Sequence, residues 1–392
     1  MRSINRKAAL GTCLLFALTL PGYTIRPKAA IHEEMTRAAK HCFDLAEQYG
    51  NKPEHCATRL DRAERRRVDV RWTHDKFILP SAGYPNLEQA VRWPDDPTRQ
   101  IRAPTIGKLA ATMLRECEWS AQSGVTINDG LLCNSHHGQM QFLHAQASDS
   151  GEAASVTHAK IMAWAEFLYE VASGQMDSTK LDSDYCTYFE GESPFNRAMR
   201  PDTLAVPCRR GRPEGWNVAT LFLLRCSNPL RSTVCNEDVS PSRYEKARII
   251  AVGALLHLIQ DSFSQSHCAR GQCDDSTGRV KPVVECMPIT MFTTYGVQDK
   301  SRHAQADRRP EFAPSCANND SIDDPVTASA KVLWHVRHGS STAKFREDFY
   351  RVFGRPETIL ASGVPSGSGN CFARRTRRPE QARRQEPGSS TR

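Results

Sequence analysis

Residues 243–261 are the part of this chain that most limits how it can fold. Apolar residues recur there at three- and four-residue spacing, which is the pattern of a helix. Ser262, Ser264 and Ser266 follow, and such residues are unfavourable inside helices because their side chains compete for backbone hydrogen bonds. We therefore expect a long apolar helix that ends close to residue 262.

Six further segments have the same helical spacing: 33–49, 106–119, 156–172, 218–226, 326–338 and 343–353. Strand-like alternation is scarce. The polar stretches 177–216 and 268–300 are rich in Pro, Gly, Asp and Cys, and we expect loops pinned by disulfides there. No internal repeat or clean linker divides the chain. These observations predict a mainly α protein with a single helical domain over residues 31–370.

The N-terminal segment 1–30 is typical of a secretory signal peptide. Three basic residues precede an apolar stretch at 8–20, which is too short to span a membrane. Cleavage after Ala30 is one possible start of the mature chain, and an uncleaved anchor is the alternative interpretation.

The cysteine content also indicates an exported protein. Thirteen of the 14 cysteines lie beyond the signal segment, which favours disulfides and a secreted or periplasmic location. Because thirteen is odd, one thiol must be free or bonded to another chain. The spacing of Cys268 and Cys273 could suggest a thiolate zinc site, but in an exported protein a role in disulfides is the favoured interpretation.

The net charge of +8 is concentrated at the two ends of the chain. Residues 1–30 carry five bases and no acids, and residues 374–392 carry seven arginines against two glutamates, so residues 31–373 have a net charge of −2. This composition gives no support to a broad basic groove for nucleic acid. The tail 371–392 contains almost nothing to bury and is predicted to be disordered; transient contact with an anionic or membrane surface is its alternative role.

Two side chains of the central helix are suited to binding a cation. His257 and Asp261 are one helical turn apart, so an imidazole and a carboxylate share one face, and His267 follows six residues later. A lone pair of this kind is more often a core histidine with a neighbouring acid. Other ligands must therefore decide between a metal site and simple packing.

The spacing His-x3-Asp-x5-His at residues 257, 261 and 267 resembles the signature of the zinc-dependent phospholipase C and S1/P1 nuclease superfamily, with the same gaps. The resemblance extends over most of the chain as an ordered series of short motifs. It implies a helical domain that binds a cluster of three zinc ions in a cleft.

The motifs upstream of the central helix nominate three further ligands. The early histidine of the family resembles His32 within 31–39, and its Trp-x-Asp step resembles residues 93–97, which nominates Asp95 with Asp96 second. A histidine is then expected before the central helix. We favour His136 in the segment 135–144, with His137 second and His144 as a packing residue or a residue that contacts a ligand.

Downstream, the family has a histidine and a carboxylate four residues apart, which resembles His303 and Asp307. The resemblance thus implies three sites: Asp95, His136, His257 and Asp261 for one zinc; His267, His303 and Asp307 for a second; His32 with a bridging Asp261 for a third.

This sequence departs from the family in two places. The third zinc of the family is also held by the mature N-terminal amine, usually of a tryptophan, whereas the first tryptophan here is Trp72. Processing after Ala30 would instead place the amine of Ile31 beside His32. The 35 residues between His267 and His303 also form a long insertion, whose cysteines indicate a disulfide-stapled segment near the cleft.

The implied activity is hydrolysis of a phosphodiester by metal-activated water, with Asp95 as a ligand or as the base that accepts a proton. The sequence contains neither a nucleophile elbow nor a phosphate-binding glycine loop. A phospholipase C is expected first, because the folded part is nearly neutral and Met291, Phe292 and Tyr295 could contact lipid. A single-strand nuclease is the alternative, because Asp307 is the last ligand type of that branch. A metal-binding protein without catalysis is the third interpretation.

Overall fold

The computed structural model describes residues 31–56, 86–97, 131–200, 216–226, 235–270, 283–298, 303, 305–306, 311–312, 316 and 319–362. These residues are mainly helical, as the sequence predicts. The signal segment 1–30, the expected helix 106–119 and the tail 371–392 lie outside these ranges, so the structure leaves those predictions untested.

Five long helices agree with predicted segments to within two residues at each end. They are α1 (Ile31–Gln48), α7 (Ala154–Ser173), α12 (Arg243–Asp261), α15 (Pro325–Arg337) and α16 (Thr342–Phe353). Shorter helices lie between them: α4 (Leu87–Ala90), α6 (Leu131–His137), α11 (Thr220–Leu223), α17 (Pro356–Ser362) and the 3-10 turns η3 (Gln141–His144) and η4 (Tyr295–Val297).

The segment expected to be a polar loop, 177–216, contains three short helices: α8 (Ser178–Leu181), α9 (Tyr185–Tyr188) and α10 (Pro194–Met199). Asp177, Asp184 and Ser193 each accept a hydrogen bond from the backbone N–H three residues later. Because such caps satisfy exposed N–H groups at a helix start, they favour single helical turns even where the apolar pattern is weak.

The predicted helix 218–226 is wrong in its last three residues. Helix α11 ends at Leu223, and β1 (Leu224–Cys226) pairs antiparallel with β2 (Cys235–Glu237). Pairing with a later strand overrides the local helical pattern there. Two other small ladders join β3 (Cys268–Arg270) to β5 (Ile289–Phe292), antiparallel, and β4 (Val283–Val284) to β6 (Glu311–Phe312), parallel.

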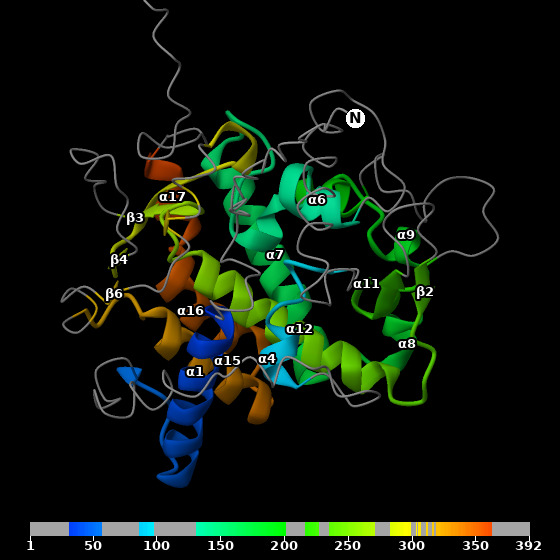
Figure 1. Cartoon of the computed structure of the whole chain (residues 1–392), viewed down its shortest axis with the longest axis horizontal. Helices are drawn as coiled ribbons and strands as arrows, with labels where there is room; N and C mark the ends of the chain where they lie inside the picture. The colour runs from blue at the N-terminus through cyan, green and yellow to red at the C-terminus, as the bar shows by residue number, and fades with distance from the viewer. Residues whose placement is uncertain are drawn as a thin grey trace, which may run out of the picture.

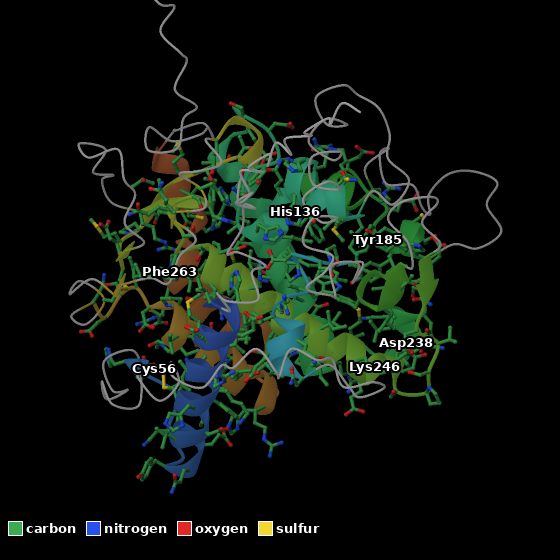
Figure 2. All side chains as sticks on the ribbon, in the orientation of Figure 1. Cys56, His136, Tyr185, Asp238, Lys246 and Phe263 are labelled. Atoms are coloured by element: carbon green, nitrogen blue, oxygen red, sulfur yellow. A yellow bond between two sulfur atoms is a disulfide. The ribbon has the colours of Figure 1, made fainter. Side chains whose placement is uncertain are left out.

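Helix α12 lies at the centre of the fold (Figure 1), packed against α7, α15 and α4. Every residue from Ile250 to Asp261 is buried. A helix that is buried on all sides is stable only when other elements cover it, which explains why the rest of the fold packs around this segment. In Figure 2, Lys246 and Phe263 mark the two ends of α12, and His136 lies above the helix between them.

Gly253 allows the segment that follows α4 to lie directly on α12. A Cβ atom at this position would come within 2.2 Å of the backbone carbonyl carbon of Ala90. Trp93 fixes the segment from the other side by packing against Trp164 and Phe222. Residues 91–95 are therefore held against the half of α12 that carries His257.

Disulfides staple the described parts of the chain. Cys42 pairs with Cys56 and Cys286 with Cys316, so the long insertion is stapled through Cys286 to a residue beyond His303. The favoured disulfide role is wrong for Cys268, which is a free, buried thiol. Such bonds persist in oxidising compartments and so favour an extracellular or similar location. Within the described ranges, no helix combines the length and apolar character that crossing a membrane requires.

Candidate metal centre

His257 and Asp261 meet on one face of α12, as their spacing predicts. Nε2 of His257 lies 2.9 Å from Oδ2 of Asp261, and both side chains are at most 1% exposed. Nδ1 of His257 donates to the carbonyl oxygen of Val91 at 2.8 Å. The close approach at Gly253 thus fixes the imidazole, because it brings this carbonyl within reach of the helix.

His144, expected only as a packing residue or a residue that contacts a ligand, belongs to the same cluster. Its Nδ1 lies 2.9 Å from Oδ2 of Asp261 and 3.1 Å from Nε2 of His257. Its Nε2 is buried and has no hydrogen-bond partner among the described residues. The geometry therefore makes His144 a candidate ligand and not merely a packing residue. Its place after the apolar pair Phe142-Leu143 is the sequence signal that could have indicated burial.

The turn after His144 is held from both sides. Ala145 adopts a positive φ of 56°, which costs a residue with a Cβ about 1 kcal/mol. The carbonyl oxygen of His144 accepts from Nδ1 of His267 at 2.6 Å, and that of Ala145 accepts from the Cys268 thiol at 3.3 Å. The segment that follows α12 thereby secures the conformation that directs His144 toward Asp261.

Asp95 and His136 are also brought to this cluster. Ligand atoms of Asp95, His136 and His144 lie within 4.8 Å of one another, and a second such group joins Asp95 to His32 and His257. Nδ1 of His136 donates to the carbonyl oxygen of Leu132 at 3.0 Å. The structure thus gathers both favoured residues, whereas the second choices Asp96 and His137 belong to none of the groups found among the described residues.

Helix α1, which packs against α15, α4 and α12, adds His32 to the cluster. Its ring stacks on that of His257 with centroids 4.0 Å apart, and its Nε2 lies 3.4 Å from Oδ1 of Asp261. Asp261 therefore faces His32 with one carboxylate oxygen and faces His144 and His257 with the other. This arrangement fits the bridging role that the sequence resemblance assigned to Asp261.

His267 and His303 lie side by side at the edge of the cluster, with ring centroids 5.3 Å apart. Nδ1 of His267 is 3.5 Å from Oδ2 of Asp261, which links this pair to the rest. Asp307, the third expected ligand of this pair, lies outside the described residues.

The imidazoles share one pattern of hydrogen bonding. Nδ1 faces an oxygen acceptor in each of these residues: His32, His136, His257, His267 and His303. An acceptor at Nδ1 places the proton of a neutral imidazole there and leaves the lone pair on Nε2. This is the arrangement in which protein histidines bind metal ions.

Neighbouring charges and burial shift the pKa values of Asp261 and His32 in opposite directions. Burial raises the pKa of Asp261, but the imidazoles of His257, His267 and His144 outweigh it and hold the pKa well below its usual range. Burial lowers the pKa of His32, yet the carboxylates of Asp261 and Asp95 raise it to about 9. A cation at this centre would therefore meet an ionised Asp261 and would displace a proton from His32.

Burial dominates at two other imidazoles. It lowers the pKa of His136 well below its usual value, with further lowering by His144, and it lowers that of His257 despite the nearby Asp261. These rings are therefore neutral near pH 7, which is the form that binds a metal ion. The donor set is imidazole and carboxylate in three buried or nearly buried groups, and it fits a divalent cation.

The residues expected to contact lipid do not form an exposed apolar loop. Phe292 is fully buried in β5, Tyr295 is 8% exposed, and Met291 is half-buried. The ring of Tyr295 packs edge-on against His137 and His303, with centroids 4.7 and 4.9 Å apart. Tyr295 thus belongs to the wall of the centre, and these residues are not the exposed apolar loop that the sequence suggested.

Comparison with protein-family models, curated proteins and solved structures found no match to this chain.

Proposed function

We propose that this protein is a zinc-dependent hydrolase of phosphodiesters that binds two or three metal ions. One observation carries the proposal: a single buried carboxylate, that of Asp261, lies within 3.5 Å of imidazole nitrogens of four histidines. These histidines come from α1, η3, α12 and the segment after α12. The resemblance of the spacing at residues 257, 261 and 267 to zinc-dependent phosphodiesterases supports the same assignment.

In this proposal, the residues of the centre act as metal ligands or as the base that accepts a proton. His32, Asp95, His136, His144, His257, Asp261, His267 and His303 are the candidate ligands. Bound zinc would supply a Lewis acid that activates water and neutralises charge on the phosphate. Asp95 is 7% exposed and lies in two of the candidate ligand groups, so its carboxylate could accept a proton from water that enters the centre. The buried walls exclude bulk solvent, which strengthens every charge interaction inside.

Phospholipid remains the first substrate in this proposal, and single-stranded nucleic acid is the alternative. The near-neutral charge of residues 31–373 supports lipid over a long polyanion. The disulfides and the segment 1–30 support action outside the cytoplasm.

Metal content tests the first part of the proposal. Elemental analysis of purified protein should find two or three zinc ions per chain, and a chelator should abolish activity. Protein that folds and contains no metal, and takes up none on dialysis against zinc, would overturn the proposal.

The second test concerns activity. Phosphatidylcholine and single-stranded DNA are assayed in parallel with wild-type protein and with Asp261→Asn. The amide removes the charge that four imidazoles face, so we expect turnover of the true substrate to fall by about 1,000-fold or more. The control is Asp44→Asn, on the exposed face of α1. Cleavage of neither substrate by zinc-loaded wild-type protein would contradict a phosphodiesterase.

A further inference from the structure

We propose that Gln298 and Gln260 are positioning residues, which set the tautomers of His303 and His32 and thereby determine zinc affinity. This inference rests on the proposed metal centre and assigns a role to two side chains that the motif does not include. Neither glutamine is a candidate ligand, because a divalent ion of this type takes imidazole and carboxylate donors.

The orientation of Gln298 follows from its neighbours without ambiguity. Its Nε2 donates to the carbonyl oxygen of Ser266 at 2.7 Å, and a carbonyl oxygen can only accept. Its Oε1 must therefore face Nδ1 of His303, which lies 2.6 Å away. Since an amide oxygen also only accepts, the proton of His303 is on Nδ1, and Nε2 is left with the lone pair.

Gln298 also couples two parts of the centre. Ser266 directly precedes His267, so one buried amide holds His303 and the backbone beside His267 in a fixed relation. Gln298 is 1% exposed, so water does not compete for these bonds. The side chain thus bridges His303 and the segment that follows α12.

Gln260 plays the corresponding part for His32. Its Oε1 lies 2.8 Å from Nδ1 of His32, and its Nε2 donates to Oγ1 of Thr36 at 3.0 Å. Gln260 is fully buried and adjoins Asp261 in the sequence. It therefore links α12 to α1 and turns Nε2 of His32 toward the carboxylate that the other histidines share.

Substitution by glutamate should have different effects at positions 260 and 298. At residue 260 a carboxylate can accept from His32 and also from the hydroxyl of Thr36, which can donate as well as accept. At residue 298 a carboxylate would face the carbonyl oxygen of Ser266 with no proton to donate. Glutamate should therefore restore function at 260 and fail to do so at 298.

The experiment measures zinc affinity by competition with a chelator, using the full chain stripped of metal. Gln260→Leu and Gln298→Leu should each weaken binding of at least one zinc ion by 10- to 100-fold, as is typical when a partner of a ligating histidine is lost. Gln260→Glu should bind zinc within about threefold of wild type, and Gln298→Glu should remain weak.

Gln146→Leu is the matched control. Gln146 is 2% exposed, and its amide donates to the same carbonyl oxygen of Ser266, at 3.3 Å, and to Thr293 at 3.4 Å. The substitution removes a buried amide from the same region, and neither of these two hydrogen bonds involves His32 or His303. Zinc affinity should therefore stay within about threefold of wild type.

Histidine-selective ¹⁵N NMR of the zinc-loaded proteins separates positioning from simple packing. Wild-type protein should show His32 and His303 protonated at Nδ1, and each leucine variant should lose that signature at its own histidine. Equal zinc affinity in wild type and both leucine variants would overturn this inference alone. An equal loss in Gln146→Leu, or no recovery in Gln260→Glu, would also overturn it. Wild-type protein that binds no zinc would instead overturn the proposed function and this inference together.

Discussion

Asp261 shows how much a single side chain can organise. Its two oxygens face different imidazoles, so neutralising the carboxylate would affect His257 on α12, His144 in η3 and His32 on α1. Because this carboxylate is buried among several imidazoles, its surroundings differ from those of an acidic side chain on the exposed face of a helix. Among the residues of the centre, we therefore expect the replacement of a single atom at Asp261, as in Asp261→Asn, to have the largest effect on metal binding.

The structure and the sequence rank two histidines differently, which leads to a prediction. His144 contacts both Asp261 and His257, whereas His136 is half-buried and reaches the centre through Asp95 and His144. We expect His144→Ala to lower kcat/KM by about 100-fold or more and His136→Ala to lower it less.

Paired kinetic and zinc-binding measurements on the two alanine variants check this ranking. His158→Ala is the control, because that histidine bonds to the carbonyl oxygen of Gly354 and belongs to none of the metal-competent groups found among the described residues. A larger loss in His136→Ala than in His144→Ala would restore the original assignment.

Sequence spacing could predict the pair on α12 but not the choice between His136 and His144. The four-residue gap between His257 and Asp261 fixes their relation through helical geometry alone. The approach of η3 to α12 instead depends on a turn at Ala145 and on hydrogen bonds from His267 and Cys268. These contacts join residues more than a hundred positions apart, so no local pattern contains them.

At the scale of elements, the arrangement of His257 on α12 depends on the close approach of the segment that follows α4. The contact between Gly253 and the backbone of Ala90 brings Val91 O to His257 and places Asp95 nearby. At its far end, Arg270 donates to the carbonyl oxygens of Ser262, Met287 and Val352. The helix is thus anchored on both sides of its metal-competent residues.

Gly253→Ala tests this account of the contact. The added methyl group must push the Ala90–Val91 backbone away, so we expect a loss of about 1–3 kcal/mol in the free energy of unfolding. We also expect weaker zinc binding, because the Val91 carbonyl moves from His257. Gly296→Ala is the control, since a Cβ there has open space. Unchanged stability and zinc affinity in Gly253→Ala would contradict the account.

Helix prediction from the sequence was accurate where apolar spacing runs for three turns or more, as in α7 and α12. It failed over Leu224–Cys226, where pairing with β2 decides the conformation. It also missed the short helices of 177–200, which depend on capping by Asp177 and its equivalents more than on an apolar face. Long-range pairing and single-turn caps leave little periodicity to detect.

At the scale of the molecule, helix α1 is tied to the C-terminal helices by several independent links. The Cys42–Cys56 disulfide closes the turn after α1, and the N–H of Cys56 donates to Thr327 of α15. Lys52 pairs with Asp348 of α16, which also accepts from His335 at 2.5 Å. Figure 1 shows α1 and α15 side by side, so these links hold His32 in place from a distance.

Asp348 should make the molecule sensitive to acid. Burial raises its pKa, but hydrogen bonds from His335 and Lys52 outweigh that effect and lower the pKa to about 2. A depressed carboxylate pKa stabilises the fold above the unfolded pKa of about 4, and this stability is lost as the pH falls toward 2. The contribution at pH 7 is roughly 2 kcal/mol.

Urea denaturation at pH 7 and pH 3 of wild type and Asp348→Asn checks this. The variant should be less stable than wild type by about 2 kcal/mol at pH 7, and the difference should shrink at pH 3. Glu347→Gln is the control, because its ion pair with Arg355 is exposed and should contribute little. A difference that is the same at both pH values would contradict the ionic role of Asp348.

The distances along the chain between the clustered residues also determine when the centre can form. His32 and Gln260 are 228 residues apart, and His144 and Asp261 are 117 apart. Closing such long loops costs entropy before any contact repays it, so contacts of this kind form late in folding. The candidate ligands are therefore expected to come together only when α1 docks on α12 and α15, at a late stage of folding.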